Sequence, residues 1–268
     1  MTAYRIVQVD AFASRPFEGN PAAVMPLEEW LPEATMQAIA AENNLAETAF
    51  TVRSARGDAD YDLRWFTPTV EVDLCGHATL ASAHVLIDGD AVRFSTRSGI
   101  LTVTRGEDDL LKLDLPAFAV APGTEPGLLD ALGLPAGTAT FLGRGGNGAA
   151  IALLADEAAV RAVDPDFRAL RSIDRLVIVT APGDATDIAS RVFAAYHGID
   201  EDPVTGSAHA ALVPFWAEKL ARPRFTAYQA SKRGGRLDCE LRGTFAKEGA
   251  RVILGGHCVT VIEGHFQL

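Results

Sequence analysis

The sequence is poor in the residue types that mark secreted, membrane-spanning or nucleic-acid-binding proteins. Three cysteines, Cys75, Cys239 and Cys258, are too few and odd in number for a disulfide framework, which favours a reducing compartment. Lys and Arg number 24 against 35 Asp and Glu, without a basic run that could follow a phosphate backbone, so nucleic acid is excluded as a partner. Apolar runs such as 149–155 and 210–217 fall far short of the ~20 residues that span a bilayer. Residues 4–10 alternate like a strand and show no export signal, so we expect a cytoplasmic protein without a membrane segment.

What is present suffices for a folded protein with a sizeable core. The 268 residues are 48% hydrophobic and 22% charged, which suits one large domain or two smaller ones. The segment richest in Pro and Gly, 122–127, lies near the middle, where a linker is expected. We therefore predict an N-terminal half, 1–118, and a C-terminal half, 119–258, with a last strand, 259–268, that returns to the first half.

Local patterns predict a mixture of strands and short helices in both halves. Pro32 followed by strong helix formers predicts a helix that ends near Asn43-Asn44, and a second helix is expected over 77–87. Strands are expected from β-branched and alternating residues over 4–12, 22–25, 48–53, 61–66, 92–96, 101–103, 111–115, 149–154 and 176–180. Short helices are expected over 156–163 and 166–170.

Three short matches in the same order indicate an internal repeat. Arg64-Trp65-Phe66 matches Arg191-Val192-Phe193, and Cys75-Gly76-His77-Ala78 matches Thr205-Gly206-Ser207-Ala208. In the third match, Ser98-Gly99-Ile100-Leu101 resembles Gly234-Gly235-Arg236-Leu237. We infer a duplicated α/β unit whose two halves face one another.

The repeated Gly76-His77 and Gly206-Ser207 pairs are the strongest candidates for binding. Each pair is expected where the chain begins a helix, so unpaired backbone N–H groups and the positive helix end could hold an anion. His77 and Ser207 could add side-chain donors. The structural alternative is that the glycines simply end strands and Ser207 caps a helix.

Several motifs together resemble the PhzF-like family of phenazine-biosynthesis isomerases, which is related to diaminopimelate epimerase. The resemblance follows the chain in order and covers nearly all of it. The motifs are Asp10-Ala11-Phe12, Phe17-Glu18-Gly19-Asn20-Pro21-Ala22-Ala23-Val24, Asn44-Leu45-Ala46-Glu47-Thr48-Ala49-Phe50, Asp73-Leu74-Cys75-Gly76-His77-Ala78-Thr79 and Glu201-Asp202-Pro203-Val204-Thr205-Gly206-Ser207-Ala208.

The resemblance implies an α+β fold of two pseudo-symmetric α/β-roll halves of the diaminopimelate-epimerase type, each a mostly antiparallel sheet around a central helix. The active site would lie in the cleft between the halves. By the same resemblance, the catalytic residues are Glu47, the acid/base, with His77, Asp202 and Ser207. Asn20, Gly76, Ala78, Thr205 and Gly206 would bind the substrate. The family implies a small anionic substrate, no cofactor and no metal, and it admits a homodimer.

The predicted function is a cofactor-independent isomerase that shifts a proton on a small, cyclic or amino-acid-like carboxylate. The epimerase relatives carry a thiol before each helix-starting glycine, whereas this chain has Cys75 in one place and Thr205 in the other, which disfavours a two-thiol racemase. A single Glu47 can move a proton between two carbons on one face. His77, His84 and His209 lack the short spacing of a zinc centre.

Two other functions stay open at this point. A non-catalytic protein could hold small carboxylates in the same cleft, with Glu47 as a hydrogen-bond acceptor. A cysteine-dependent racemase or hydrolase could use Cys75, with His77 as its base. Solvent deuterium exchange at a bound carbon distinguishes an isomerase from a binding protein.

Overall fold

In the computed structural model, which describes residues 2–143, 148–245 and 249–268, the chain divides into two units. The first unit joins Met1–Asp114 to Gly255–Leu268, and the second is Leu115–Leu254. The chain passes between the units within two strands, β8 and β17, each of which continues two residues past the boundary. The first unit is therefore built from both ends of the chain.

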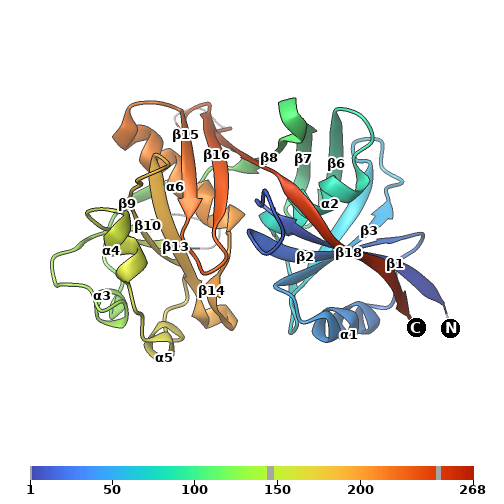
Figure 1. Cartoon of the computed structure of the whole chain (residues 1–268), viewed down its shortest axis with the longest axis horizontal. Helices are drawn as coiled ribbons and strands as arrows, with labels where there is room; N and C mark the ends of the chain where they lie inside the picture. The colour runs from blue at the N-terminus through green and yellow to red at the C-terminus, as the bar shows by residue number, and fades with distance from the viewer. Residues whose placement is uncertain (1, 144–147, 246–248) are drawn as a thin grey trace. The chain divides into compact units, whose positions relative to one another are not determined.

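The first unit is a mixed sheet with two α-helices (Figure 1). Its elements are β1 (Ala3–Ala11), β2 (Asn20–Leu27), α1 (Glu33–Asn43), β3 (Glu47–Arg53), β4 (Tyr61–Phe66), β5 (Glu71–Val72), α2 (Gly76–Leu86), β6 (Ala91–Thr96), β7 (Gly99–Arg105), a 3-10 turn (Glu107–Asp109), β8 (Leu111–Pro116) and β18 (Cys258–Gln267). The strand order is β18-β1-β2-β3-β4-β6-β7-β8, with β5 also on β4. Only the β2–β3 and β4–β6 pairs in this order are parallel.

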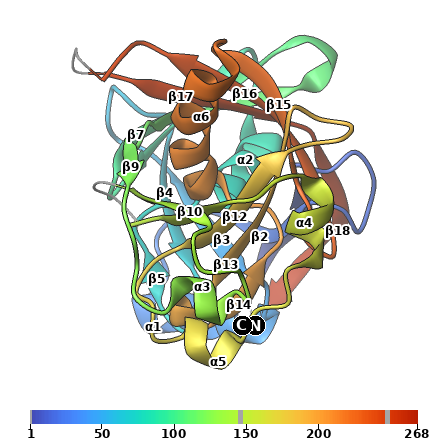
Figure 2. The same cartoon turned by 90° about the vertical axis from the view of Figure 1, so that its left-hand side faces the viewer.

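The second unit repeats this arrangement (Figure 2). Its elements are β9 (Val120–Pro122), α3 (Leu128–Ala131), β10 (Ala139–Gly143), β11 (Ala150–Leu153), α4 (Glu157–Ala162), α5 (Phe167–Leu170), β12 (Val177–Pro182), β13 (Ile188–Ala194), a 3-10 turn (Ala195–His197), β14 (Ile199–Asp202), α6 (Gly206–Leu220), β15 (Arg224–Gln229), β16 (Gly235–Arg242) and β17 (Arg251–Gly256). The order β9-β10-β11-β12-β13-β15-β16 has parallel pairs at β11–β12 and β13–β15.

The two units therefore share one topology, and the predicted fold class is confirmed. In both units, successive strand pairs are antiparallel, parallel, antiparallel, parallel and antiparallel, in that order. Parallel neighbours need a long connection, and here α2 and α6 supply it in their respective units. The sheets are mostly antiparallel, and each connecting helix is apolar.

The connecting helices are buried around most of their circumference. Eight of the eleven residues of α2 and eleven of the fifteen residues of α6 are buried. A helix that is apolar on all sides belongs inside a domain, which accounts for the long apolar run in α6. The helix α1 begins after Pro32 and ends before Asn44, whose backbone is left-handed. Both limits agree with the sequence-based prediction.

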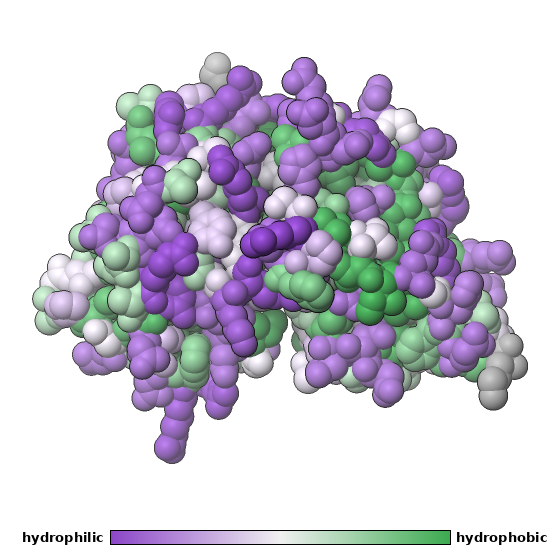
Figure 3. Space-filling model, in the orientation of Figure 1, coloured by the Kyte–Doolittle hydropathy of each residue, from purple (hydrophilic) through white to green (hydrophobic). Residues whose placement is uncertain are grey.

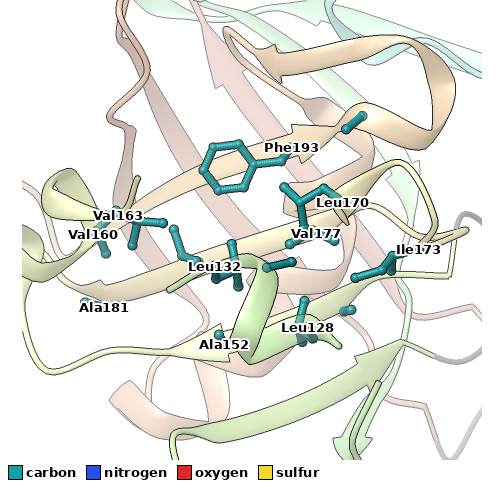
Figure 4. Packing of buried hydrophobic residues seen from close by; sticks show 14 residues of the cluster. Leu128, Leu132, Ala152, Val160, Val163, Leu170, Ile173, Val177, Ala181 and Phe193 are labelled. Carbon is teal, nitrogen blue, oxygen red and sulfur yellow. The ribbon is translucent and has the colours of Figure 1, made fainter. Parts of the chain in front are cut away.

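The sheet of the second unit is covered on both faces. One face carries a hydrophobic cluster from α3, α4, α5 and alternate residues of β11, β12 and β13, including Val177 and Phe193 (Figure 4). On the other face, the Trp216 indole of α6 donates a hydrogen bond to the Thr180 hydroxyl of β12 at 3.0 Å. Alternation along a strand explains this division, because neighbouring residues such as Val179 and Thr180 point to opposite faces.

The internal repeat has a physical basis in matching side-chain contacts. Arg64 on β4 makes a two-pronged ion pair with Glu71 on β5, both hydrogen bonds measuring 2.7 Å. At the equivalent positions, Arg191 on β13 pairs in the same way with Glu201 on β14, at 2.8 and 3.0 Å. Each pair fastens a short strand to the strand before the central helix. The positions that match in sequence are thus positions with the same structural task.

The surface is mostly hydrophilic on the face drawn in Figure 3, as the charged fraction of the sequence leads one to expect. Within the described ranges, no helix combines the length and apolar character needed to cross a membrane.

Candidate active site

The first unit gathers three polar side chains around His77. The His77 Nε2 atom lies 3.0 Å from Glu47 Oε2, and Nδ1 lies 3.1 Å from the amide nitrogen of Asn20 and 3.6 Å from Cys75 Sγ. Asn20 begins β2, Glu47 begins β3, and Cys75 directly precedes α2. The sheet therefore brings together residues that are far apart in the sequence. His77 is 4% exposed and Glu47 9%, so both are largely shielded from water.

The charges within this cluster are set by burial and by Glu47. Burial by itself lowers the pKa of His77, but the negative charges of Cys75, when ionised, and of Glu47 outweigh it and leave the pKa well above its usual value. Burial, together with the Glu47 carboxylate, raises the pKa of the Cys75 thiol to about 11. The thiol is therefore neutral near pH 7, which leaves Glu47 as the acidic partner of His77. The cluster is thus a His77–Glu47 pair beside an inert thiol.

Asn20 suits either protonation state of His77. Its amide nitrogen can donate to an unprotonated Nδ1, and its amide oxygen can accept from a protonated Nδ1 once the amide is turned over. Asn20 is completely buried, so its contact with the ring is protected from competing water. It therefore fixes the orientation of the His77 ring against Glu47.

The second unit has a different polar cluster at the equivalent place. The Thr205 hydroxyl donates a short hydrogen bond to the Asp202 carboxylate. Gln229, the last residue of β15, accepts a hydrogen bond from the Thr205 N–H at 2.9 Å and donates to the Asp202 carbonyl at 2.7 Å. The Gln229 amide also donates to the Thr205 hydroxyl at 3.2 Å. Two strands, β14 and β15, thus converge on the residue that precedes α6.

The two central helices begin in the same way. In each, the residue before the first glycine has extended backbone, and the side chain four residues on returns to its carbonyl. Thr79 donates its hydroxyl to the Cys75 carbonyl, and the His209 ring contacts the Thr205 carbonyl, both within 2.8 Å. Among the described residues, no side-chain capping hydrogen bond is made by Cys75 or Thr205 at these helix ends. N–H groups in the first turn have no acceptor within their helix, which suits them to an anion.

A matching serine hydroxyl holds the chain just before each helix. Ser98 donates to the Asp73 carbonyl and Ser231 to the Pro203 carbonyl, both at 2.8 Å. The acceptors lie two residues before Cys75 and Thr205 respectively. The helix-starting segments are thus fastened in both units from the turn after the strand that follows the helix.

Each residue predicted for the site has a definite place. Asn20, Glu47 and His77 come together in the first unit, where Gly76 and Ala78 lie in the first turn of α2. Asp202 and Thr205 come together in the second unit, where Gly206 and Ser207 begin α6. Gln229 was missed by sequence reasoning. Gln229 could have been noticed only as a polar residue at the end of a strand whose residues alternate in burial. Many surface strands share this pattern.

The other predicted histidines lie outside the His77 cluster. His84 contacts the Thr260 hydroxyl of β18 at 3.0 Å, and His209 is completely buried in α6. Glu47, Cys75 and His77 do carry potential metal-ligand atoms within 4.8 Å of one another. Glu47 approaches one ring nitrogen and Cys75 the other, so a single ion bound to one nitrogen could reach both only after rearrangement. A hydrogen-bonded cluster describes this geometry better than a metal centre.

Comparison with known proteins identifies the family. The family model described as phenazine biosynthesis-like protein matches residues 9–264. A curated relative from Pseudomonas aeruginosa, named an uncharacterized isomerase, is 50% identical over 97% of both chains. The chain belongs to the PhzF-like family.

Solved structures agree with this assignment. A PhzF-family protein from Enterococcus faecalis is 45% identical, covers 100% of both chains and has a TM-score of 0.89. A hydroxyproline epimerase from Agrobacterium vitis, at 12% identity and a TM-score of 0.64, covers 99% of this chain and 91% of its own, and it shares the fold alone. This PhzF-like chain is an isomerase with the diaminopimelate-epimerase-like fold.

Within the PhzF-like fold, the two units differ in two informative positions. Strand registers pair Thr48 with Phe66 and Val177 with Phe193, so Glu47 of the first unit corresponds to Leu176 of the second. Likewise, Cys75 corresponds to Thr205. Both units therefore begin their central helix in the same way. Only the first unit has a carboxylate at this strand position, Glu47 at the start of β3.

Proposed function

We propose that this PhzF-like isomerase shifts a proton between two carbons of a small carboxylate, with Glu47 as the single acid/base and without a cofactor. The observation that carries the proposal is the shielded contact between Glu47 and His77 at the N-terminus of α2. A carboxylate held in a fixed direction can remove a proton from one carbon and return it to another on the same face. Leu176 at the equivalent place in the second unit offers no second base.

The surrounding residues fit supporting roles in this reaction. His77 orients Glu47 and balances its charge, and Asn20 fixes the His77 ring. The first-turn N–H groups of α2, at Gly76 and Ala78, and those of α6, at Gly206 and Ser207, are each suited to binding a carboxylate. Asp202, kept in place by Thr205, would accept a hydrogen bond from a polar group of the substrate.

The thiol hypothesis fits the site less well. Cys75 has a pKa raised to about 11, so very little thiolate is present near neutral pH. Its counterpart, Thr205, has a hydroxyl that is far too weak an acid to complete a two-base exchange. Cys75 is better described as a small side chain that packs against the His77 ring.

The decisive experiment follows hydrogen–deuterium exchange. Small cyclic and amino carboxylates are incubated with the protein in D₂O, and loss of C–H signals is followed by NMR. Once an exchanging compound is found, Glu47→Gln should lower its exchange rate at least about 100-fold and leave its Kd within about tenfold, because the amide keeps the shape but cannot accept the proton.

Two control variants make the result specific. Cys75→Ser should retain most of the activity, and Glu42→Gln, which changes an exposed acid on α1, should have no effect. A greater loss in Cys75→Ser than in Glu47→Gln would support the thiol mechanism instead. Compounds that bind without exchange in the unaltered protein would indicate a carboxylate-binding protein.

A further inference from the structure

Thr205 is placed to cap α6 but does not do so. A threonine that precedes a helix normally accepts a hydrogen bond from the N–H of the second or third helical residue. Here the Thr205 hydroxyl donates to Asp202 and accepts from the Gln229 amide, which holds it away from the helix. Among the residues that the structure describes, no side-chain hydrogen bond from Thr205 closes this helix end.

Gln229 makes this arrangement from a completely buried position. Its side-chain oxygen accepts from the Thr205 N–H, while its nitrogen donates to both the Asp202 carbonyl and the Thr205 hydroxyl. A buried amide that satisfies several partners is held in a single orientation, because each lost hydrogen bond would leave a polar group unpaired. The direction of the Thr205 hydroxyl is therefore determined by Gln229.

The first unit shows that the fold does not require this arrangement. The parallel registers β4–β6 and β13–β15 place Thr96 where Gln229 stands, and the helix offset places Val72 where Asp202 stands. The corresponding helix nevertheless begins with the same backbone and the same serine contact. The Asp202–Thr205–Gln229 cluster is thus an addition to one unit, which points to a task at its helix end.

We propose that Gln229 is a positioning residue that keeps the Thr205 hydroxyl on Asp202, so that the first-turn N–H groups of α6 stay available to the substrate carboxylate. The inference rests on the proposed function, because it concerns the carboxylate binding that the proposed function assigns to the first turn of α6. Without Gln229, the Thr205 hydroxyl is free to turn toward the helix and accept a hydrogen bond from the Ala208 N–H. The protein would then cap its own helix and compete with its ligand.

The test uses acetate as the probe, since it is the simplest carboxylate. Acetate is titrated into the ¹⁵N-labelled full-length protein, and the Kd is obtained from amide shifts of Gly206, Ser207 and Ala208. Gln229→Met, which keeps the volume but removes all three hydrogen bonds, should weaken acetate binding about tenfold. Gln229→Glu keeps an acceptor for the Thr205 N–H but removes the donors. It should also weaken acetate binding, and it serves as the test if the Met variant does not fold.

A double variant separates self-capping from general loosening. In a Thr205→Ala background no hydroxyl can cap the helix, so adding Gln229→Met should change the Kd less than about threefold. Ser231→Ala removes a hydrogen bond to the same segment, at Pro203, without touching Thr205 and should bind acetate within about twofold of the unaltered protein.

The outcomes that overturn the proposal are distinct. A tenfold loss that persists in the Thr205→Ala background would show that Gln229 acts only by supporting the segment. Unchanged binding in both Gln229 variants, or no acetate-induced shift at α6 in the unaltered protein, would refute the positioning role. The deuterium-exchange test of Glu47 is independent of acetate, so the isomerase proposal stands or fails separately.

Discussion

At the scale of single residues, two buried histidines have opposite electrostatic surroundings. His77 faces Glu47, and its pKa is raised well above the usual value despite burial. His209, buried within α6, has no acidic partner among the residues that the structure describes, and burial lowers its pKa to about 4 although the Thr205 carbonyl accepts a hydrogen bond from its ring. Two histidines near the starts of equivalent helices therefore have pKa values shifted in opposite directions.

His209 should make the protein sensitive to mild acid. A histidine whose pKa is lower in the folded state contributes stability above its unfolded pKa of about 6.5, and this stability is lost as pH falls toward 4. Over that interval the loss for a fully buried group is about 3 kcal/mol. The unfolding free energy of the unaltered protein should thus fall by up to that amount more than that of His209→Gln.

Urea unfolding at several pH values between 7 and 4 provides the measurement. His265→Gln, at an exposed position on β18, is the matched control and should follow the unaltered protein. If the unfolding free energies of His209→Gln and of the unaltered protein depend on pH in the same way, protonation of His209 does not destabilise the folded protein.

At the scale of elements, the loop between β1 and β2 positions Asn20 for its contact with His77. The β1–β2 pairing sets Asn20 opposite Ala11, and the loop turns through Gly19 with a φ of +66°. A Cβ atom on Gly19 would lie 2.1 Å from the Ala11 carbonyl oxygen. The clashing oxygen belongs to the backbone, which cannot move aside as the end of a flexible side chain can, so glycine is required here.

Replacing Gly19 should therefore damage both stability and the site. We expect Gly19→Ala to cost more than about 3 kcal/mol, since the unfavourable φ and the backbone clash add together. Gly89→Ala is the control, because its φ is +98° but no heavy atom of the described residues lies within 4 Å of the new Cβ. That change should cost only about 1–2 kcal/mol.

Chemical denaturation of both variants, with the His77 ring followed by NMR, provides the check. The His77 signals should shift in Gly19→Ala and remain unchanged in Gly89→Ala. Equal stability losses in the two variants would contradict the clash at Ala11.

At the scale of the whole molecule, the chain leaves the first unit, builds the second and returns. The returning strand, β18, pairs antiparallel with β1 from Ala3–Gln267 to Ala11–Cys258. It carries Thr260, which contacts His84 on α2. The unit that contains Glu47 therefore depends on residues that follow the whole second unit in the sequence.

Deleting residues 258–268 should loosen the first unit selectively. Hydrogen exchange measured by mass spectrometry should show at least about 100-fold less protection in β1 and β2, because β1 loses one of its two hydrogen-bonded neighbours and becomes an edge strand. Protection in β12 and β13 should change less than about threefold. Removing only Gln267 and Leu268 is the control, and a similar loss in both units after the longer deletion would contradict this prediction.

The sequence by itself determined the features that depend on neighbouring residues. Pro32 and Asn44 mark the ends of α1 through local backbone preferences, and α2 was predicted to within one residue at each end. The duplication was visible because local motifs such as Arg64-Trp65-Phe66 and Arg191-Val192-Phe193 perform the same task twice. The fold class followed from these matches and from the family resemblance, and it is confirmed.

Only the tertiary structure decided which distant side chains meet. Glu47 and His77 are thirty positions apart, and their contact arises because α2 packs against the sheet that contains β3. Gln229 resembles any polar residue at a strand end until the parallel β13–β15 pairing brings it to Thr205. Such contacts depend on strand register, which is fixed by the packing of the whole sheet and cannot be read from the residues on either side.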